Sequence, residues 1–379
     1  MFSFAVYDDA AMGRFEIEPH ETTHVHPQGR RGRGSLSNVS GRFEIEARLR
    51  QDDGWGALDE TPPPLRTTVA VDATRRVIAR NASPDIPFSQ SINPYRGCEH
   101  GCIYCYARPT HAYLGLSPGL DFESRLFAKP NAARLLEAEL REPGYRCAVM
   151  ALGTNTDPYQ PIEREHRITR SVLDVLAAFD HPVGIVTKSA LVQRDIDILA
   201  PLAAKNLAKV AISITTLDRK LARAMEPRAA TPGRRLETIG ALAAAGIPVG
   251  VMVAPIIPGL NDWEIERILD AAAEVGATEA GFTLLRLPHE IKDMFREWLA
   301  EREPLKAGKV IQLVRETRGG QLNDPRFGSR MSGQGPIADL IRNRFRLACA
   351  RLELNRRDLR LDCSRFRRPP AVSDQFGLF

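Results

Sequence analysis

Short apolar runs alternate with amphipathic stretches between Ser91 and Leu285. The runs are bounded by turn residues, as buried strands usually are, and the stretches between them have helical spacing. The predicted strands are Ser91–Pro94, Ala148–Leu152, Val183–Val186, Lys209–Ile214, Val249–Ala254 and Glu279–Leu285. The predicted helices are Ala132–Leu140, Ile168–Phe179, Val192–Ala203, Gly233–Ala245 and Asp262–Val275. This alternation predicts an α/β fold with a parallel sheet.

Six strand–helix units suit an incomplete version of the eight-stranded α/β barrel, a partial (β/α)6 barrel. Periodicity alone leaves an open doubly wound sheet as the alternative. Barrels of this kind bind their ligands at the C-terminal ends of the strands. Site residues are therefore expected just after each predicted strand.

The segments on either side of this region differ from it in character. Pro27–Ser40 is rich in Gly, Arg and Ser and is predicted to be flexible. In Thr67–Val71, a weak alternation of apolar and polar positions indicates an added edge strand. The polar loop Glu316–Gly328 is expected to fold over the barrel mouth. The predicted organisation is an irregular N-terminal extension over 1–85, the barrel over 86–287 and a helical, Arg-rich extension over 288–379.

Composition excludes some classes of protein. Of the 379 residues, 43% are hydrophobic and 26% are charged, which is typical of a globular chain. No apolar run approaches the roughly 18 residues that a membrane span requires. The first eighteen residues do not resemble a secretory signal. Six cysteines do not indicate a disulfide scaffold, so a reducing cytoplasmic location is expected.

The net charge of +5 is modest, but arginines cluster in two places. Arg30, Arg31 and Arg33 indicate a solvated tail or, less often, a phosphate-binding arm. The C-terminal arginines indicate either nucleic-acid binding or a solvated helix face neutralised by nearby acids. They are Arg342, Arg344, Arg346, Arg351, Arg356, Arg357, Arg360, Arg365, Arg367 and Arg368, with Asp339, Glu353, Asp358 and Asp362 among them.

Three cysteines, Cys98, Cys102 and Cys105, follow the first predicted strand at C-x₃-C-x₂-C spacing. Thiolates bind soft metals and iron–sulfur clusters, and an ordinary [4Fe–4S] cluster takes four of them. Three cysteines would leave one iron open. The alternatives are a structural zinc site, for which this spacing is unusual, and an electron-transfer cluster. The latter would take a remote fourth ligand from Cys147, Cys349 or Cys363.

This cysteine run, with Tyr104 directly before the third cysteine, resembles the radical S-adenosylmethionine superfamily, and the whole chain resembles a bacterial branch related to spore photolyase. The resemblance implies a six-stranded partial barrel. It also implies that Cys98, Cys102 and Cys105 hold a [4Fe–4S] cluster whose open iron takes the amino and carboxylate groups of S-adenosylmethionine. A low-potential electron donor of the flavodoxin or ferredoxin type is implied as a partner. The substrate of this branch is not identified.

The resemblance extends to residues that follow the later strands. After the second strand, Asp157 with Thr156 would meet the amino group of the cofactor through a charge-assisted hydrogen bond. After the third and fourth, Lys188 and Ser213 would contact its carboxylate or ribose. Further residues implied near the cofactor are Tyr104 and Tyr106 on the adenine side, and Glu226 and Arg235, for which a helix-entry ion pair is an equal alternative.

One departure concerns the hydrogen-atom donor. Spore photolyase has a cysteine three residues before the aspartate of the strand-two loop, and this chain has Thr154 there. Cys147 precedes the strand and is expected near the opposite end of the barrel. Repair of thymine dimers by the same mechanism is therefore not predicted.

The sequence accordingly predicts an enzyme that cleaves S-adenosylmethionine reductively to a 5′-deoxyadenosyl radical, which takes hydrogen from an unknown substrate, with a nucleic acid or nucleotide among the possibilities. The alternative is an iron–sulfur or zinc protein that binds nucleic acid without radical chemistry. A binding module would not need Asp157 and Lys188 at successive strand ends.

Overall fold

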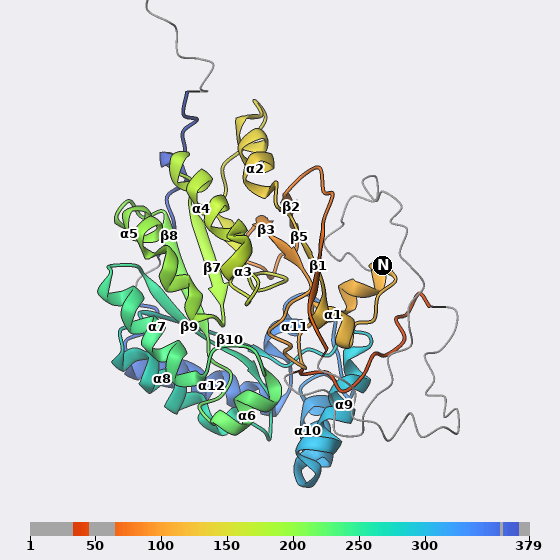
Figure 1. The fold of residues 1–379 in the computed structure, drawn as a ribbon. Coiled ribbons are helices and arrows are strands. Elements are labelled where there is room, and N and C mark those ends of the chain that lie inside the picture. Colours follow the sequence, from red (N-terminus) through yellow and green to blue (C-terminus); the bar gives the residue numbers. More distant parts are fainter. Residues whose placement is uncertain (1–32, 45–64, 357–358, 371–379) are drawn as a thin grey trace, which may run out of the picture.

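A seven-stranded sheet forms the centre of the computed structural model, which describes residues 33–44, 65–356 and 359–370 (Figure 1). Its strand order is β10-β9-β8-β7-β6-β3-β2, in which all neighbours are parallel except β3 and β2. The strands are β2 Ile78–Arg80, β3 Gln90–Ile92, β6 Met150–Leu152, β7 Val183–Thr187, β8 Ala208–Ser213, β9 Val249–Ile256 and β10 Glu279–Leu284. All six predicted strands are confirmed, and only the antiparallel edge strand β2 was not predicted.

Helices connect successive parallel strands and cover the sheet. They are α2 Ala132–Arg141, α3 Glu163–His166, α4 Ile168–Ala178, α5 Ile196–Ala204, α6 Arg219–Met225, α7 Pro232–Ala244 and α8 Ile265–Glu274. Two predicted helices begin with a 3₁₀ turn, η3 Ala190–Asp195 and η4 Asp262–Glu264. The fold is therefore α/β, with six parallel strands arranged as in a partial barrel.

The main hydrophobic core lies between the sheet and its helices. Leu152 of β6, Ile212 of β8 and Leu269 of α8 are fully buried within it. Parallel strands are covered on both faces, which is why these runs read as almost continuously apolar. Two edges of the sheet matter below. The C-terminal edge of the parallel strands is called the mouth, and the N-terminal edge is called the base.

A second, three-stranded sheet has the order β1-β5-β4. It consists of β1 Thr68–Val71, β4 Tyr95–Arg96 and β5 Arg125–Ala128. The predicted edge strand at Thr67–Val71 is thus confirmed as an edge strand, and it belongs to this second sheet. It pairs in parallel with β5, which lies more than fifty residues further along the chain. Local alternation carries no information about so distant a partner.

Residues 33–40 were predicted to be flexible, and this prediction is wrong for them, because they are fixed against the mouth. Arg33 is buried and its Nη1 donates to Glu123 O at 2.6 Å, while the N–H groups of Gly34 and Ser35 donate to the Glu123 carboxylate. A Cβ at Gly34 would lie 1.7 Å from Gly101 O, so only glycine permits this approach. Arg30, Arg31 and residues 27–32 as a whole lie outside the described residues.

The later part of the chain is helical, with α9 Ile291–Arg302, α10 Pro304–Glu316, α11 Ser329–Ser332, α12 Pro336–Arg351 and the 3₁₀ turn η5 Cys363–Arg365. Helices α9 and α10 form a second core around Trp298, which also contains Cys102 and Tyr104. Helix α12 packs into the main core through Ala338 and Ile341. The domain boundaries predicted at 85/86 and 287/288 stay a prediction.

The segment from α10 to α11 runs from one edge strand of the sheet to the other. Arg318 is buried and its Nη2 donates to Leu284 O and Leu285 O at the end of β10. Arg330 then forms an ion pair with Asp85, in the loop between β2 and β3, at 2.6 Å. The chain therefore crosses the open side of the partial barrel here.

Residues 359–370 lie at the base instead (Figure 1). Phe366 contacts Tyr145 and His181, and Arg367 forms an ion pair with Asp180 at 2.6 Å. Arg368 donates to Leu140 O at the end of α2. Within the described residues, no helix combines the length and the apolar character needed to cross a bilayer.

Candidate active site

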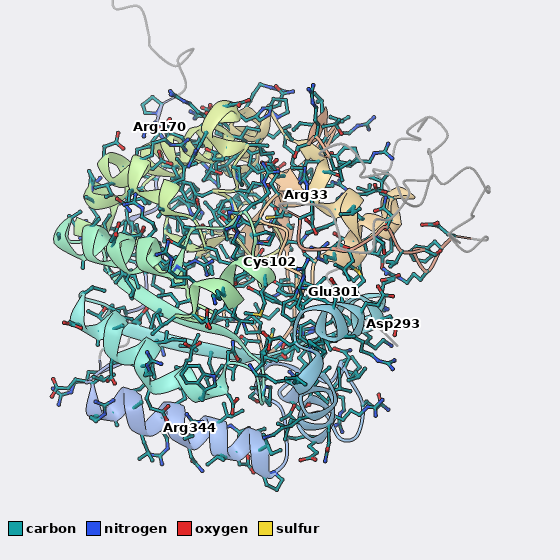
Figure 2. All side chains as sticks on the ribbon, turned by 60° about the horizontal axis from the view of Figure 1, so that its bottom comes forward. Arg33, Cys102, Arg170, Asp293, Glu301 and Arg344 are labelled. Carbon is teal, nitrogen blue, oxygen red and sulfur yellow. The ribbon has the colours of Figure 1, made fainter. Side chains whose placement is uncertain are left out.

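The three clustered cysteines lie on a loop, residues 97–106, that follows β4 at the mouth. Cys98 N–H donates to Phe122 O at 2.9 Å, and two tight turns follow, closed by Gly101 N–H on Cys98 O and by Cys105 N–H on Cys102 O. Cys98 and Cys102 are buried and Cys105 is half-buried. Cys102 lies near the middle of the molecule (Figure 2). This stretch is called the cysteine loop below.

A buried ion pair fixes the backbone of the cysteine loop. Arg108, in the 3₁₀ helix η2 Arg108–Leu114, is fully buried and donates to Gly101 O at 3.0 Å and Cys102 O at 2.8 Å. Its Nη2 also lies 2.5 Å from Glu123 Oε1, in the short helix α1 Leu120–Ser124. Because Glu123 also binds Gly34 and Ser35, one carboxylate joins the N-terminal segment to the cysteine loop.

Gln160 supports the loop from the other side. Its side-chain Nε2 donates to Gly97 O at 3.1 Å, and its Oε1 accepts from Glu99 N–H at 2.9 Å. The buried amide thus binds the peptide groups on both sides of Cys98. A buried amide with both ends satisfied favours a single arrangement of the backbone that it joins.

Asp157 occupies the centre of the mouth, at the loop after β6. Its Oδ1 accepts from Thr187 Oγ1 at 2.6 Å and from Tyr159 N–H at 2.9 Å. Its Oδ2 accepts from Lys188 N–H at 2.8 Å and lies 3.3 Å from His100 Nδ1. Burial would raise the pKa of Asp157, but His100, Thr187 and the Lys188 N–H lower it to about 2. A carboxylate has about four acceptor positions, and four are used here, so this geometry favours a positioning role.

The side chain of Lys188 points towards the cysteine loop. Its Nζ lies 5.9 Å from the centre of the Tyr104 ring, and its charge acts on Cys102 and Glu226. No group among the described residues forms a hydrogen bond or an ion pair with this Nζ. The ammonium is therefore available to a ligand carboxylate, the role that the sequence predicts.

Glu226 and Arg235 form a buried pair next to Tyr104. The Glu226 carboxylate accepts from the Tyr104 hydroxyl and, at 2.5 Å, from Thr215 Oγ1. Burial would raise the pKa of Glu226, but Arg235 and then Lys188 lower it to about 2. Arg235 Nη1 also donates to Ser213 O at 2.9 Å, so the pair connects β8, α7 and the cysteine loop.

Three other predicted residues also lie at the mouth. Ser213 is the buried last residue of β8, and Thr156 Oγ1 donates to Tyr95 O at 2.9 Å. The half-exposed Tyr106 donates its hydroxyl to Thr154 O. All eleven residues predicted for the site thus come together at the mouth, and their contacts with a cofactor stay a prediction.

Comparison with known proteins agrees with this arrangement. Residues 92–272, from β3 through most of α8, match the family model of the Radical SAM superfamily. An uncharacterized protein of Mycobacterium tuberculosis is 40% identical over 232 residues, which are 61% of this chain and 68% of the relative. The chain belongs to the radical SAM superfamily. An uncharacterized protein of Methanocaldococcus jannaschii is 29% identical over 174 residues, 46% of this chain and 62% of that relative.

Solved radical SAM structures share the fold. Spore photoproduct lyase complexed with dinucleoside spore photoproduct superimposes with a TM-score of 0.50 at 19% identity, over 75% of this chain and 78% of that one. A point mutant of the same enzyme gives 0.50 at 18% identity, over the same shares of the two chains. At this level of identity the likeness is one of fold. Membership of the superfamily implies a [4Fe–4S] cluster and S-adenosylmethionine as cofactors.

Three free thiols on one short loop have the donor chemistry that such a cluster needs, and their role as its ligands stays a prediction. Burial, followed by the carboxylate of Asp157, raises the pKa of Cys98 well above its usual range, and burial and Glu226 raise that of Cys102 to about 12. Bound metal ions would supply positive charge that favours the thiolate form of such buried thiols. Within the described ranges, no three His, Cys, Asp or Glu side chains lie close enough to bind one metal ion, whereas a cluster is held at three separate corners.

The other three cysteines lie away from the mouth. Cys349 is buried in α12, and Cys147 lies three residues before β6, next to Cys363 at the base. The expectation that Cys147 lies towards the opposite end of the barrel is confirmed. None of the three is placed to be a fourth cluster ligand.

Five residues that shape the mouth were not singled out from the sequence: His100, Arg108, Glu123, Gln160 and Arg286. His100 lies inside the cysteine spacing, and Gln160 follows Asp157 by three residues, so proximity to a motif was an available signal. Arg108 and Glu123 carry no such signal, because ordinary charged residues are normally exposed.

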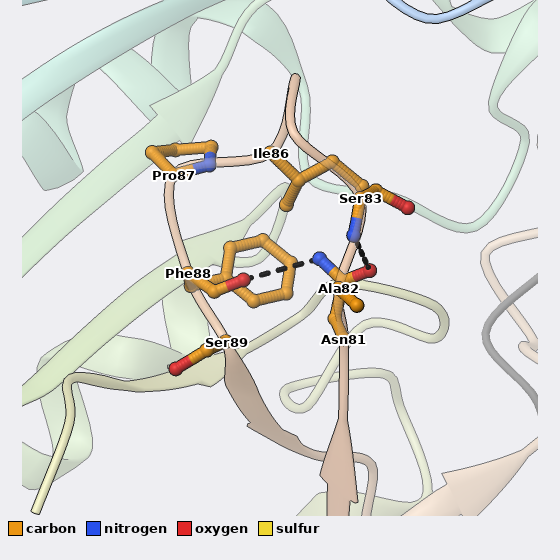
Figure 3. A pocket seen from close by; sticks show the side chains of 7 residues that line it. All are labelled: Asn81, Ala82, Ser83, Ile86, Pro87, Phe88 and Ser89. Carbon is orange, nitrogen blue, oxygen red and sulfur yellow. Dashed lines mark hydrogen bonds between the residues drawn. The ribbon is translucent and has the colours of Figure 1, made fainter.

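Two cavities are lined by described residues. The first, of about 400 Å³, is formed by the loop between β2 and β3, where Asn81 Nδ2 donates to Phe88 O (Figure 3). Its lining contains no group that titrates near neutral pH. The second, of about 260 Å³, is lined by His100 of the cysteine loop and by residues that follow β6 and β7, and its lining includes Arg164, Arg228 and Arg234.

The C-terminal arginines are largely paired with acids. Arg344 of α12 (Figure 2) contacts Glu266 of α8 at 2.6 Å. Six ion pairs of 2.5 to 3.3 Å involve these arginines: Arg342–Asp339, Arg344–Glu266, Arg351–Asp270, Arg356–Glu353, Arg365–Asp362 and Arg367–Asp180. This geometry favours a neutralised surface over a nucleic-acid interface. Arg357 and Asp358 lie outside the described residues.

Proposed function

We propose that this chain is a radical S-adenosylmethionine enzyme in which Cys98, Cys102 and Cys105 hold a [4Fe–4S] cluster and the mouth binds the cofactor. A bound cluster would supply the electron for reductive cleavage of the C5′–S bond of S-adenosylmethionine, which would release methionine and give a 5′-deoxyadenosyl radical for hydrogen abstraction from the substrate. A flavodoxin or ferredoxin type of donor provides the electron.

The chain's own residues position the reactants. Lys188 Nζ offers its charge to the methionine carboxylate beside the cysteine loop. Asp157 and His100 fix the loops after β6 and β4 with respect to each other. The Glu226–Arg235 pair holds Tyr104 in place at the side of the mouth. The Asp157 carboxylate is proposed to orient the amino group of the cofactor through the loop it fixes, with Thr156 and Ser213 beside it.

The observation that carries this proposal is the position of Lys188. Its ammonium has no partner among the described residues, and it lies over the ring that separates two of the three clustered thiols in sequence. The charge of Glu226 acts on this ammonium, but its three donors make no hydrogen bond to a described residue and are available to a ligand carboxylate. A protein that held only an iron–sulfur cluster would have no need of it.

The substrate is proposed to differ from that of spore photoproduct lyase. Thr154 lies at the mouth beside Tyr106, at the position where the resemblance implies a hydrogen-donating cysteine. Among the described residues, the remaining cysteines lie in α12 or at the base. A substrate radical formed here would therefore not be quenched by a protein thiol at the mouth.

The test is anaerobic. The full chain is reconstituted with iron and sulfide, reduced with dithionite and supplied with S-adenosylmethionine, and 5′-deoxyadenosine is quantified by chromatography. Product above that of a Cys98/Cys102/Cys105 triple-alanine control supports the proposal.

Some radical enzymes cleave the cofactor only when their substrate is present. Electron paramagnetic resonance of the reduced cluster, with and without S-adenosylmethionine, therefore accompanies the product assay. Neither product nor any change in the spectrum of an intact [4Fe–4S] cluster would contradict the proposal and favour a binding protein.

A further inference from the structure

Arg286 lies at the mouth, two residues after the end of β10. Its Cζ is 5.5 Å from the centre of the Tyr106 ring. Tyr104 and Tyr106 flank Cys105 in the sequence, with Lys188 over the first ring and Arg286 over the second. Two cations thus lie beside the two tyrosines that flank the third cysteine in the sequence, and the proposed cofactor contact uses only one of them.

The Arg286 side chain lacks polar partners. Its Nε is buried without a hydrogen-bond partner, and its Nη1 contacts only the Met331 sulfur, at 3.6 Å. A thioether is a weak acceptor. No carboxylate in the described part of the chain forms an ion pair with this guanidinium. Burial lowers its pKa, yet an arginine stays charged in proteins.

The acids nearby are already paired. Asp85 is bound by Arg330 at 2.6 Å, and Asp324 by Arg326 at 3.0 Å. Arg286 and Arg318 are therefore left without a counter-ion among the described residues, and they repel each other. Burial and then Arg286 lower the pKa of Arg318 to about 10. The local excess is two positive charges.

The nearby Arg318 has a structural role, and its hydrogen bonds differ from those of Arg286. Its two Nη atoms donate to four backbone carbonyls, those of Leu284, Leu285, Ser329 and Arg330. Those bonds hold the segment that crosses the open side of the barrel. Arg286 makes no comparable contacts, so its fork of donors is available at the mouth.

We propose that Arg286 binds a phosphate group of the substrate beside Tyr106, across Cys105 from the cofactor carboxylate at Lys188. This inference rests on the proposed function for the identity of the two ligands. A phosphate fits better than a single carboxylate, because a phosphate monoester carries about −1.5 to −2 charges at neutral pH and the site has an excess of two positive charges. The planar guanidinium also pairs with two phosphate oxygens at once.

The experiment compares wild type, Arg286→Gln and Arg286→Lys in the reconstituted full chain, by anaerobic calorimetric titration. The phosphate probe is the 5′-phosphorylated thymidine dinucleotide pTpT. Thymidine serves as the neutral comparison and a tetrapeptide of glutamates as the carboxylate comparison. S-adenosylmethionine is titrated into the same preparations, and the midpoint of thermal unfolding is measured for each variant and for Arg318→Gln.

The expected result is that wild type binds pTpT and not thymidine, and that Arg286→Gln weakens this binding about tenfold or more. Arg286→Lys should fall between the two, because an ammonium keeps the charge but loses the fork. Arg286→Gln should also unfold at the same or a higher temperature, because it removes a half-buried charge that has no ion-pair partner among the described residues. Arg318→Gln should unfold at a lower temperature.

Three results would overturn the inference: equal affinity of wild type and Arg286→Gln for pTpT, tighter binding of the glutamate peptide than of pTpT, or loss of S-adenosylmethionine affinity in Arg286→Gln. The last would assign the arginine to the cofactor. If no 5′-deoxyadenosine forms and S-adenosylmethionine does not change the spectrum of an intact cluster, while pTpT binding still depends on Arg286, the radical function fails and the phosphate site stands.

Discussion

The two ends of the parallel sheet bury polar groups in opposite ways. At the base, His181 Nε2 lies 2.7 Å from the Tyr145 hydroxyl, which donates to Gln90 Oε1, and Phe366 covers the group. These are neutral groups that satisfy one another. At the mouth, Lys188 and Arg286 are charged and lack partners among the described residues.

This difference shows which end is complete without a ligand. These groups at the base all lie within hydrogen-bond distance of partners in the protein, so an additional molecule is not needed to provide one. The mouth has its backbone fixed by Glu123, Gln160 and Asp157, while two cations and three thiols are left for ligands. Rigid support around unsatisfied groups is the arrangement that ligand binding favours.

The largest difference between the two ends is expected when one cysteine is removed from each. Cys98→Ala should abolish the [4Fe–4S] cluster and all formation of 5′-deoxyadenosine, because one corner ligand is lost. Cys363→Ala, at the base, should keep the full iron content. Iron and sulfide analysis of the two reconstituted variants, with their absorbance spectra, measures this. A complete cluster in Cys98→Ala would disprove the ligand assignment.

Ion pairs at the two ends should also differ in strength. Glu123→Gln leaves the fully buried Arg108 without its counter-ion, and we expect a loss of about 3–5 kcal/mol in the free energy of unfolding. The matched change at the base is Lys205→Met, which removes a partly exposed partner of Asp180 and should cost about 1 kcal/mol or less. Urea unfolding of the apoprotein compares them. Equal losses would show that Glu123 does not fix the mouth.

Lys188→Ala tests whether the unpaired ammonium serves a ligand. The affinity for S-adenosylmethionine should fall about tenfold or more, which is about 1.4 kcal/mol, with iron content and thermal stability unchanged. Arg234→Ala is the matched control, since Arg234 is exposed and pairs with Glu237. Equilibrium titration of the reconstituted proteins decides, and unchanged affinity in Lys188→Ala would remove this residue from the site.

The smallest expected effect is on the pH dependence of folding stability, through His181 at the base of the sheet. Burial lowers the pKa of His181 to about 4, below the ordinary value near 6.5. Between these values the unfolded chain binds more protons than the folded chain, so this contribution to stability is complete above pH 6.5 and is lost as the pH falls towards 4.

His181→Gln should therefore flatten part of the stability–pH curve between pH 6.5 and 4. The buried His111, whose pKa burial also lowers to about 4, and His289, whose pKa burial lowers as well, should keep part of the slope. Chemical unfolding at several pH values gives the two curves. Parallel curves for wild type and variant would show that His181 does not titrate across this window.

The main sheet and the metal motif could both be predicted from the sequence. The six parallel strands and their helices follow from runs of neighbouring apolar residues, and the cysteine spacing is complete within eight residues, from Cys98 to Cys105. Both signals are local. They do not depend on distant contacts, because a strand buried on both faces must be apolar whichever strand it pairs with, and because a short loop keeps its ligands close together.

Only the tertiary structure decided which distant residues complete the site. Glu123 meets Gly34 from about ninety residues away, and β1 finds β5 rather than the edge of the main sheet. Arg286 and Arg318 look alike in the sequence, yet one holds backbone carbonyls and the other is left without a partner among the described residues. The physical reason is that the role of a charged side chain depends on the hydrogen-bond and ion-pair partners it meets after folding. Those partners come from segments that are far apart in the chain.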